Sequence, residues 1–185
     1  MTDTKCRIAA SAAALGVTGI CTVITCLTPI ETTTMKVVGS FASVLAVSAA
    51  AWKFPKRFYY LALIFDFFAA ALGSVINLYR SVGFYDRFVH YLSGLLLAEA
   101  GVIIIEYLFR KRQIKSDSLI RLVFAFFFSC ACAGFWEIYE FTADILIKAN
   151  MQGDNSNTMG DIVSGVLGAL TYFCASLLMM KRKKR

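Results

Sequence analysis

Six apolar stretches of roughly 20 residues divide this chain of 185 residues, and they limit its fold more than any other feature. A helix of about 20 residues crosses the ~30 Å hydrocarbon core of a bilayer. Because unpaired backbone groups cannot face lipid, each stretch is predicted to be a helix. Only short polar connections remain, so we predict an all-α polytopic membrane helix bundle, a single integral membrane domain over residues 1–185. The predicted spans are 8–28, 37–53, 58–79, 88–109, 119–141 and 159–180.

The amino-acid composition also indicates a membrane protein. Hydrophobic residues make up 58% of the chain and charged residues 17%. Soluble domains contain about 45–50% apolar and about 25% charged residues. The composition therefore excludes an ordinary soluble globular protein.

Basic residues alternate between the two sides of the predicted bundle. Both chain ends, the second loop, and the fourth loop with the start of the next span carry 15 of the 19 Lys and Arg residues. The positive-inside rule places these segments, and both termini, in the cytoplasm. This topology, with contact between the basic tail and anionic lipid headgroups, explains the formal net charge of +7 without nucleic acid. We therefore expect membrane lipids as partners, and a homo-oligomer stays open.

The stretch FYDRFVHYLSG, residues 84–94, opens the fourth predicted span and contains the only histidine of the chain. Asp86 and His90 are four residues apart, so they share one face of a helix. Taken singly, Asp86 could be a helix N-cap and His90 an interfacial histidine. The polar residues that other spans bring to the same end favour a shared site for Asp86 and His90.

Three other predicted spans bring polar residues to the same outer end. Glu137, Glu140 and Asp144 follow one another at spacings of three and four near the end of the fifth span. Asp161 opens the sixth span, and Asn77 lies near the end of the third. Ionisable residues within a membrane cost about 2.5–3.5 kcal/mol each on insertion scales, and by default they mark function. The sequence therefore predicts a polar pocket that opens to the outside.

Two carboxylates are predicted to lie deeper in the membrane. Asp66 falls within the third span and Glu99 near the middle of the fourth. They could form a proton path or fix the packing of helices. At the inner end, Glu106 and Arg110 are four residues apart and are expected to form a surface ion pair.

These motifs resemble those of the YjdF-like family of small bacterial inner-membrane proteins, whose function is unassigned. The resemblance rests on Tyr85-Asp86-Arg87-x-x-His90-x-x-x-Gly94, on Trp136-Glu137-x-x-Glu140-Phe141, and on Asn157-Thr158-Met159-x-Asp161 followed by Gly168-Ala169. It implies a multi-pass protein of the bacterial cytoplasmic (inner) membrane. The third motif departs from the family pattern at Asn157, where an aspartate usually stands, and Asp154 is a carboxylate that could replace it. A weaker likeness is to the VanZ-like family, which also has an acid-and-histidine motif at the start of a span.

The first hypothesis for the function is a metal-dependent enzyme that acts on lipid headgroups or lipid-linked phosphates. One histidine with several carboxylates suits a divalent cation such as Mg²⁺, Mn²⁺ or Zn²⁺. His90 and Glu137 would be catalytic, and Arg87 and Asn77 would bind the substrate. The expected metal ligands are Asp86, His90, Glu137, Glu140 and Asp161. The sequence has no H-E-x-x-H motif, nucleophile elbow or Gly-rich phosphate loop to name the chemistry.

Two other classes of function stay open. A small proton- or cation-coupled transporter would use Asp66 and Glu99 at mid-membrane, where transporter sites usually lie. No inverted repeat relates the two halves of the sequence. A membrane scaffold or sensor would use the buried acids only to specify helix packing.

Overall fold

The computed structural model of the chain describes residues 3–115, 117–149 and 151–183. Within these ranges the chain forms helices and no strand, which confirms the predicted all-α class. The elements are α1 (Asp3–Leu27), α2 (Thr34–Ala50), α3 (Lys56–Asp66), the π-helix η1 (Phe67–Val75), α4 (Leu78–Ser81), α5 (Tyr85–Lys111), α6 (Ser118–Ile147) and α7 (Asn155–Lys183).

The chain divides into two compact units, Met1–Val89 and His90–Arg185. Unit 1 contains α1 to α4, and unit 2 contains α6, α7 and most of α5. The boundary falls inside α5, but α5 is one continuous helix.

Among the described residues, five helical segments are long and apolar enough to cross a membrane. They are Asp3–Leu27, Lys56–Val75, Tyr85–Lys111, Ser118–Ile147 and Asn155–Arg182. The stretch predicted at 37–53 corresponds to α2, which has 17 residues. This helix begins three residues before the predicted start because the Thr33 hydroxyl accepts the Lys36 N–H at 3.3 Å, as an N-cap does.

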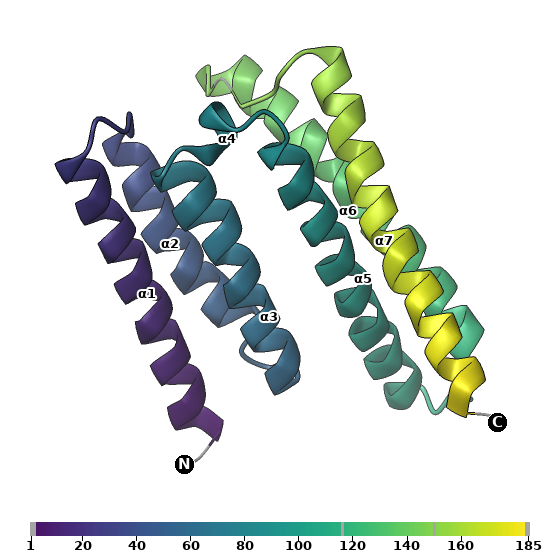
Figure 1. The fold of residues 1–185 in the computed structure, drawn as a ribbon. Helices are drawn as coiled ribbons and strands as arrows, with labels where there is room; N and C mark the ends of the chain where they lie inside the picture. The colour runs from purple at the N-terminus through teal and green to yellow at the C-terminus, as the bar shows by residue number, and fades with distance from the viewer. Residues whose placement is uncertain (1–2, 116, 150, 184–185) are drawn as a thin grey trace. The chain divides into compact units, whose positions relative to one another are not determined.

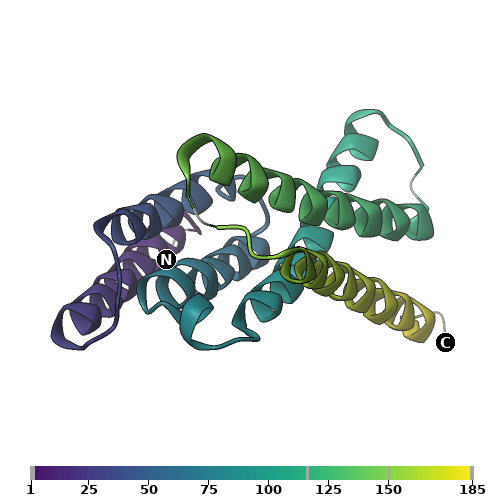
Figure 2. The same ribbon diagram turned by 90° about the horizontal axis from the view of Figure 1, so that it is seen from above.

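In unit 1, α1, α2 and α3 run in alternating directions (Figure 1). Seen from above, they pack together as one group (Figure 2). Arg7 is buried in this group, and its guanidinium donates to the carbonyls of Trp52 and Phe54 at 3.0 Å each. These bonds tie the start of α1 to the connection between α2 and α3.

The third membrane segment is not a regular α-helix to its end. It continues from α3 into the π-helix η1, then breaks at Asn77, which has a left-handed φ of 65°. Asparagine tolerates this conformation better than most residues. Gly73 allows the chain to fold back, since a Cβ there would lie 2.3 Å from the Tyr79 ring. Local π-helices often occur at functional sites.

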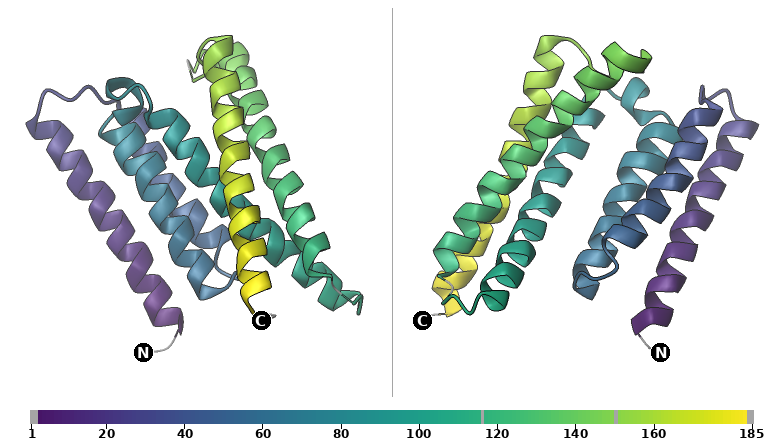
Figure 3. Two further views of the ribbon diagram at one scale, coloured as in Figure 1. Left: turned by 45° about the vertical axis from the view of Figure 1, so that its right-hand side comes forward. Right: turned by 180° about the vertical axis from the view of Figure 1, so that it is seen from behind.

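In unit 2, α6 and α7 lie side by side (Figure 3). The backbone of α5 approaches α7 very closely: a Cβ on Gly94 would lie 2.1 Å from the Gly165 carbonyl oxygen, and one on Gly168 would lie 2.1 Å from that of Tyr91. Ser129 of α6 donates to the Gly94 carbonyl at 2.9 Å. Small residues and a buried hydroxyl are the usual means of joining helices within a membrane.

Candidate functional site

The first turn of α5 presents the acid and the histidine of the FYDRFVHYLSG stretch. Asp86 and His90 lie one turn apart on this helix. Asp86 is half-buried, whereas His90 is buried. Arg87, between them, is exposed.

The start of α7 contributes a completely buried carboxylate, Asp161. The side-chain amide of Asn157 donates to its Oδ2 at 2.6 Å. Asp154 accepts the backbone N–H of Asn157 at 2.8 Å and so caps the first turn of α7. The carboxylate of Asp161 is thus oriented by a residue one turn earlier on the same helix.

Asp86, His90 and Asp161 each offer one ligand atom, and these atoms all lie within 4.8 Å of one another. Two carboxylate oxygens and one imidazole nitrogen are donors that Mn²⁺ and Zn²⁺ accept, and the oxygens alone suit Mg²⁺. Three protein ligands would leave positions of the cation open to water or substrate, as in catalytic zinc sites. We refer to these three residues as the outer cluster.

Glu137 of α6 lies beside the histidine of the outer cluster. Its carboxylate is buried, and Oε1 is 3.8 Å from His90 Nε2. This distance fits an ion pair but exceeds a hydrogen bond. A carboxylate next to the ring of a metal-bound histidine orients that ring and raises its basicity. The geometry thus suits Glu137 as a neighbour of the ligands.

The other acids near the end of α6 have different surroundings. Trp136 donates its indole N–H to Glu140 at 2.8 Å. Asp144 accepts the backbone N–H groups of Met151 and Gln152 at 2.8 and 2.9 Å. Asp144 therefore holds the connection that leads from α6 to α7, which in turn sets the start of α7.

The remaining predicted residues lie away from the outer cluster along the chain. Asn77 is buried in unit 1, where its side-chain oxygen accepts the Lys36 ammonium at 2.8 Å. Asp66 is also buried in unit 1, at the end of α3. Glu99, in unit 2, accepts a hydrogen bond from the Tyr172 hydroxyl.

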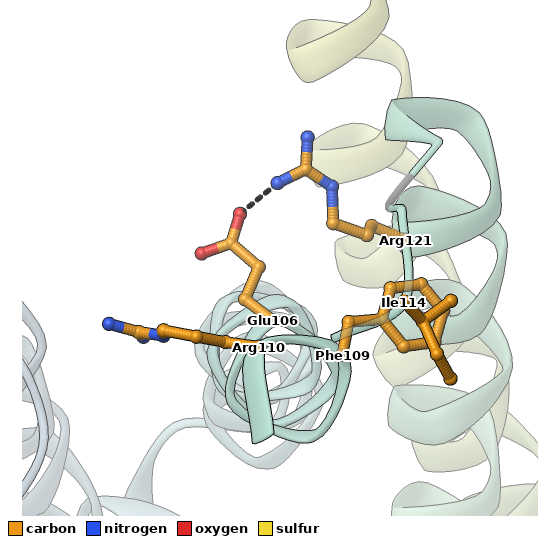
Figure 4. Close-up of a pocket in the computed structure, with 5 residues that line it drawn as sticks. All are labelled: Glu106, Phe109, Arg110, Ile114 and Arg121. Carbon is orange, nitrogen blue, oxygen red and sulfur yellow. Dashed lines mark hydrogen bonds and ion pairs between the residues drawn. The ribbon is translucent and has the colours of Figure 1, made fainter. Parts of the chain in front are cut away.

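Sequence reasoning missed two of these partners and misjudged a third. Tyr172 and Lys36 each lie more than 40 positions from the residues they contact, and no local spacing relates them. The predicted pair of Glu106 with Arg110 is wrong: Glu106 pairs with Arg121 of α6, and Figure 4 shows Arg110 extending away from it. A spacing of four brings two side chains to one helix face but cannot exclude a competitor from another helix.

Comparisons with known proteins identify the family but no activity. A protein of Thermotoga maritima, described as uncharacterized, is 26% identical over 120 residues, which are 64% of this chain. The chain thus spans about 60% of that relative's length. No solved structure matches the chain. The family model for a predicted membrane protein, DUF2238, matches residues 8–183. This match agrees with the resemblance to YjdF-like proteins, and the chain belongs to the DUF2238 family of predicted membrane proteins.

Proposed function

We propose that this membrane protein is a divalent-cation-dependent enzyme that acts on phosphate groups of lipid headgroups or lipid-linked phosphates. The observation that carries the proposal is the outer cluster, in which ligand atoms of Asp86, His90 and Asp161 lie within 4.8 Å of one another. Ionisable side chains are costly within a membrane segment. A cation would offset that cost and use the same groups for chemistry.

Each residue of the site has a role in this proposal. Asp86, His90 and Asp161 would hold the cation, which would polarise a phosphoryl oxygen and activate water for attack. Glu137, 3.8 Å from His90, orients the imidazole and raises its basicity as a ligand. Arg87 is exposed on the same turn of α5, where its planar guanidinium can bind a phosphate in bidentate fashion.

The ligand types favour Mn²⁺ or Zn²⁺ over Mg²⁺. Mg²⁺ prefers octahedral oxygen donors and is reluctant to lose its waters. Imidazole suits the softer transition-metal ions. We expect purified protein to retain Mn²⁺ or Zn²⁺ more readily than Mg²⁺.

The decisive experiment measures the metal content and phosphate release of the full chain purified in detergent. The substrates are a short-chain phosphatidic acid and a polyprenyl diphosphate, each supplied with Mn²⁺ or Zn²⁺. The variants are His90→Ala and Asp161→Asn, and Glu31→Gln is the control, because that carboxylate is exposed in unit 1 and pairs with Arg80. We expect near-stoichiometric metal in the parent and the control and at least a tenfold loss of retained metal in both site variants.

Two results would contradict the proposal. One is a parent protein that is folded and binds no divalent cation. The other is metal retained equally by the parent, His90→Ala and Asp161→Asn. Metal binding without phosphate release from either lipid would limit the site to a structural or transport role and reject the enzyme.

A second candidate function, a small proton- or cation-coupled transporter, is supported by the acids deeper in the spans. Asp66 is 5% exposed within the third membrane segment, and Glu99 has Tyr172 as a partner within unit 2. Transport would make Asp66→Asn and Glu99→Gln as damaging as the changes at the outer cluster. Uptake of ²²Na⁺ or a pH-sensitive dye response in proteoliposomes would detect it.

A further inference from the structure

A cavity of about 470 Å³ lies where α5 ends and α6 begins (Figure 4). It is at the end of α5 opposite to the outer cluster, on the side that the basic residues predict to be cytoplasmic. Charged and apolar side chains share its lining, which consists of Glu106, Phe109, Arg110, Ile114 and Arg121. We refer to it as the inner cavity, and the proposed function makes no use of it.

Arg121 is fixed in the inner cavity by two contacts. Its Nη1 donates to the Glu106 carboxylate, and its Nη2 donates to the Ser118 hydroxyl at 2.8 Å. A guanidinium has five N–H donors in a rigid planar fork. The two contacts set the orientation of the fork and leave further N–H groups on Nη1 and Nη2. The side chain is 26% exposed, so a ligand in the cavity can reach it.

Arg110 supplies an adjustable positive charge at the same cavity. It is exposed in the last turn of α5, and within the described part of the chain it forms no ion pair with a carboxylate. Its side chain extends outward in Figure 4, so it can turn toward a bound anion. Arg121 is thus held in place, and Arg110 is available to bind an anion.

The charge balance favours an anion in spite of Glu106. That carboxylate is paired with Arg121, so Arg110 leaves the lining with a net positive charge. Residues 106–121 contain five basic and two acidic side chains. The carbonyl end of α5 opposes an anion and Asp117 caps α6, but the first turn of α6 offers the favourable end of its dipole.

The apolar part of the lining selects among anions. Phe109 and Ile114 also line the cavity, and in Figure 4 they lie together on the side of Arg121, whereas Arg110 extends to the other side. Inorganic phosphate would contact the arginines only, whereas a phospholipid also presents a glycerol and acyl chains to the apolar side chains. Basic pockets between membrane helices on the cytoplasmic side are suited to phospholipid headgroups.

We propose that the inner cavity binds the phosphate of an anionic phospholipid, with Arg121 and Arg110 as its donors and Phe109 and Ile114 against its glycerol and first acyl carbons. The chemistry recognised is a phosphate oxyanion that bears an apolar substituent. The inner cavity lies at the opposite end of α5 from the outer cluster, so lipid binding there does not depend on metal at that cluster.

The test is native mass spectrometry of the full chain in detergent with added dioleoylphosphatidylglycerol or dioleoylphosphatidylcholine. The key variant is Arg110→Gln, which removes an exposed side chain and preserves the Glu106–Arg121 pair. Lys111→Gln is the matched control, because Lys111 is the exposed neighbour that does not line the cavity. A hydrogen bond from a charged donor strengthens binding by roughly tenfold or more. We therefore expect Arg110→Gln to weaken phosphatidylglycerol binding at least tenfold, and Lys111→Gln to change it less than twofold.

Competition separates a lipid from a soluble ligand. We expect short-chain phosphatidylglycerol to displace the bound lipid and inorganic phosphate at tenfold higher concentration to fail. Displacement by inorganic phosphate alone would reassign the cavity to a soluble phosphate and overturn the lipid. Equal losses in Arg110→Gln and Lys111→Gln, or equal binding of phosphatidylcholine, would show diffuse attraction and overturn the site. Phosphatidylglycerol binding by Arg121→Gln tests the second donor independently, and the melting temperature of this variant shows whether it is folded.

Discussion

The two ends of the α5–α7 bundle hold their charged groups in opposite ways. At the outer cluster, the short side chains of His90 and Asp161 are buried. At the inner cavity, the long side chains of Arg110 and Arg121 keep contact with solvent. A short side chain can reach a shared ion only if the helices are very close, whereas an arginine can span several ångströms. Binding at the outer cluster therefore depends on the close approach of the helix backbones, and binding at the inner cavity does not.

Glycines provide the close approach near the outer cluster. Gly165 of α7 faces the His90 carbonyl, 3.7 Å from where its Cβ would be. Gly94 and Gly168 make still closer contacts one turn further in. An added methyl group at Gly94 or Gly168 must push α5 away from α7, and with it His90 away from Asp161.

The largest expected effect is therefore that of Gly94→Ala. The new Cβ would lie 2.1 Å from the Gly165 carbonyl oxygen, which is backbone and cannot rotate away. Overpacking typically costs about 1–3 kcal/mol, and a clash with backbone belongs at the upper limit. We expect a fall of several degrees in the melting temperature of the detergent-solubilised protein and loss of retained metal.

Gly134→Ala is the control for this comparison. Gly134 lies on α6 of the same unit, and a Cβ there meets nothing within 4 Å. We expect it to be neutral or slightly stabilising, since alanine favours a helix. If both variants melted at the same temperature, close packing of α5 on α7 would be rejected.

The next effect tests how Asn157 serves the outer cluster. Asn157→Asp would replace the amide donor, 2.6 Å from Asp161, by a second carboxylate. Without a cation the two carboxylates would repel each other. With a cation bound, the added carboxylate would serve as a further ligand and strengthen binding. We expect the variant to be less stable than the parent by about 2 kcal/mol in EDTA, the cost of leaving a buried acceptor without its donor. Adding Mn²⁺ should raise the free energy of unfolding of the variant by more than it raises that of the parent.

Thermal unfolding with and without Mn²⁺ measures this difference. Equal stability of parent and variant in EDTA would mean that residue 157 does not face Asp161. A variant that Mn²⁺ fails to restore would argue against a cation at the cluster.

Much of the fold follows from the sequence because burial in lipid leaves the backbone few choices. Apolar stretches of sufficient length must be helical, so the all-α class and most spans are predictable. The end of the third span is not predictable in this way. The sequence indicates one continuous helix through Gly73 and Asn77. In the structure the helix breaks there, where Asn77 accepts from Lys36 and Gly73 packs against the Tyr79 ring. The π-helix η1 likewise has no periodic signal of its own.

Helix periodicity predicts which residues of the site share one face of a helix, and no more than that. Asp86 and His90 share a face because they are four residues apart, and alternating spans bring Asp161 to the same end. Periodicity does not say which acids of one helix turn inward. Glu137 lies beside His90, whereas Trp136 contacts Glu140. That selection depends on how α6 is rotated against α5, which long-range packing decides.

A smaller effect is expected at Tyr172→Phe, between the two ends of the bundle. The change removes the hydroxyl that donates to Glu99. Interhelical hydrogen bonds in membranes contribute about 0.6 kcal/mol on average and about 1.7 kcal/mol at most. We expect a loss within this range, measured by unfolding in a denaturing detergent.

Tyr91→Phe is the matched control, because the Tyr91 hydroxyl contacts the exposed hydroxyl of Thr171 at 3.2 Å and, among the residues that the structure describes, no carboxylate. It should lose less than Tyr172→Phe. A larger loss in the control would mean that Glu99 needs no donor. Transport activity lost in Tyr172→Phe at unchanged stability would favour the transporter over the enzyme.

The smallest expected effect on stability is that of Glu106→Gln at the inner cavity. The carboxylate pairs with Arg121 at the protein surface, and such pairs contribute about 0–1 kcal/mol. Binding of an anionic lipid should respond in the opposite direction, because the change removes a negative charge from the cavity and releases an N–H donor of Arg121. We expect a melting temperature within about two degrees of the parent and an increase in phosphatidylglycerol binding of about fivefold, as expected for one unit of charge near an anionic headgroup. Weaker lipid binding would instead mean that Glu106 is needed to hold Arg121 in place, and the inner end would then depend on fixed geometry as the outer end does.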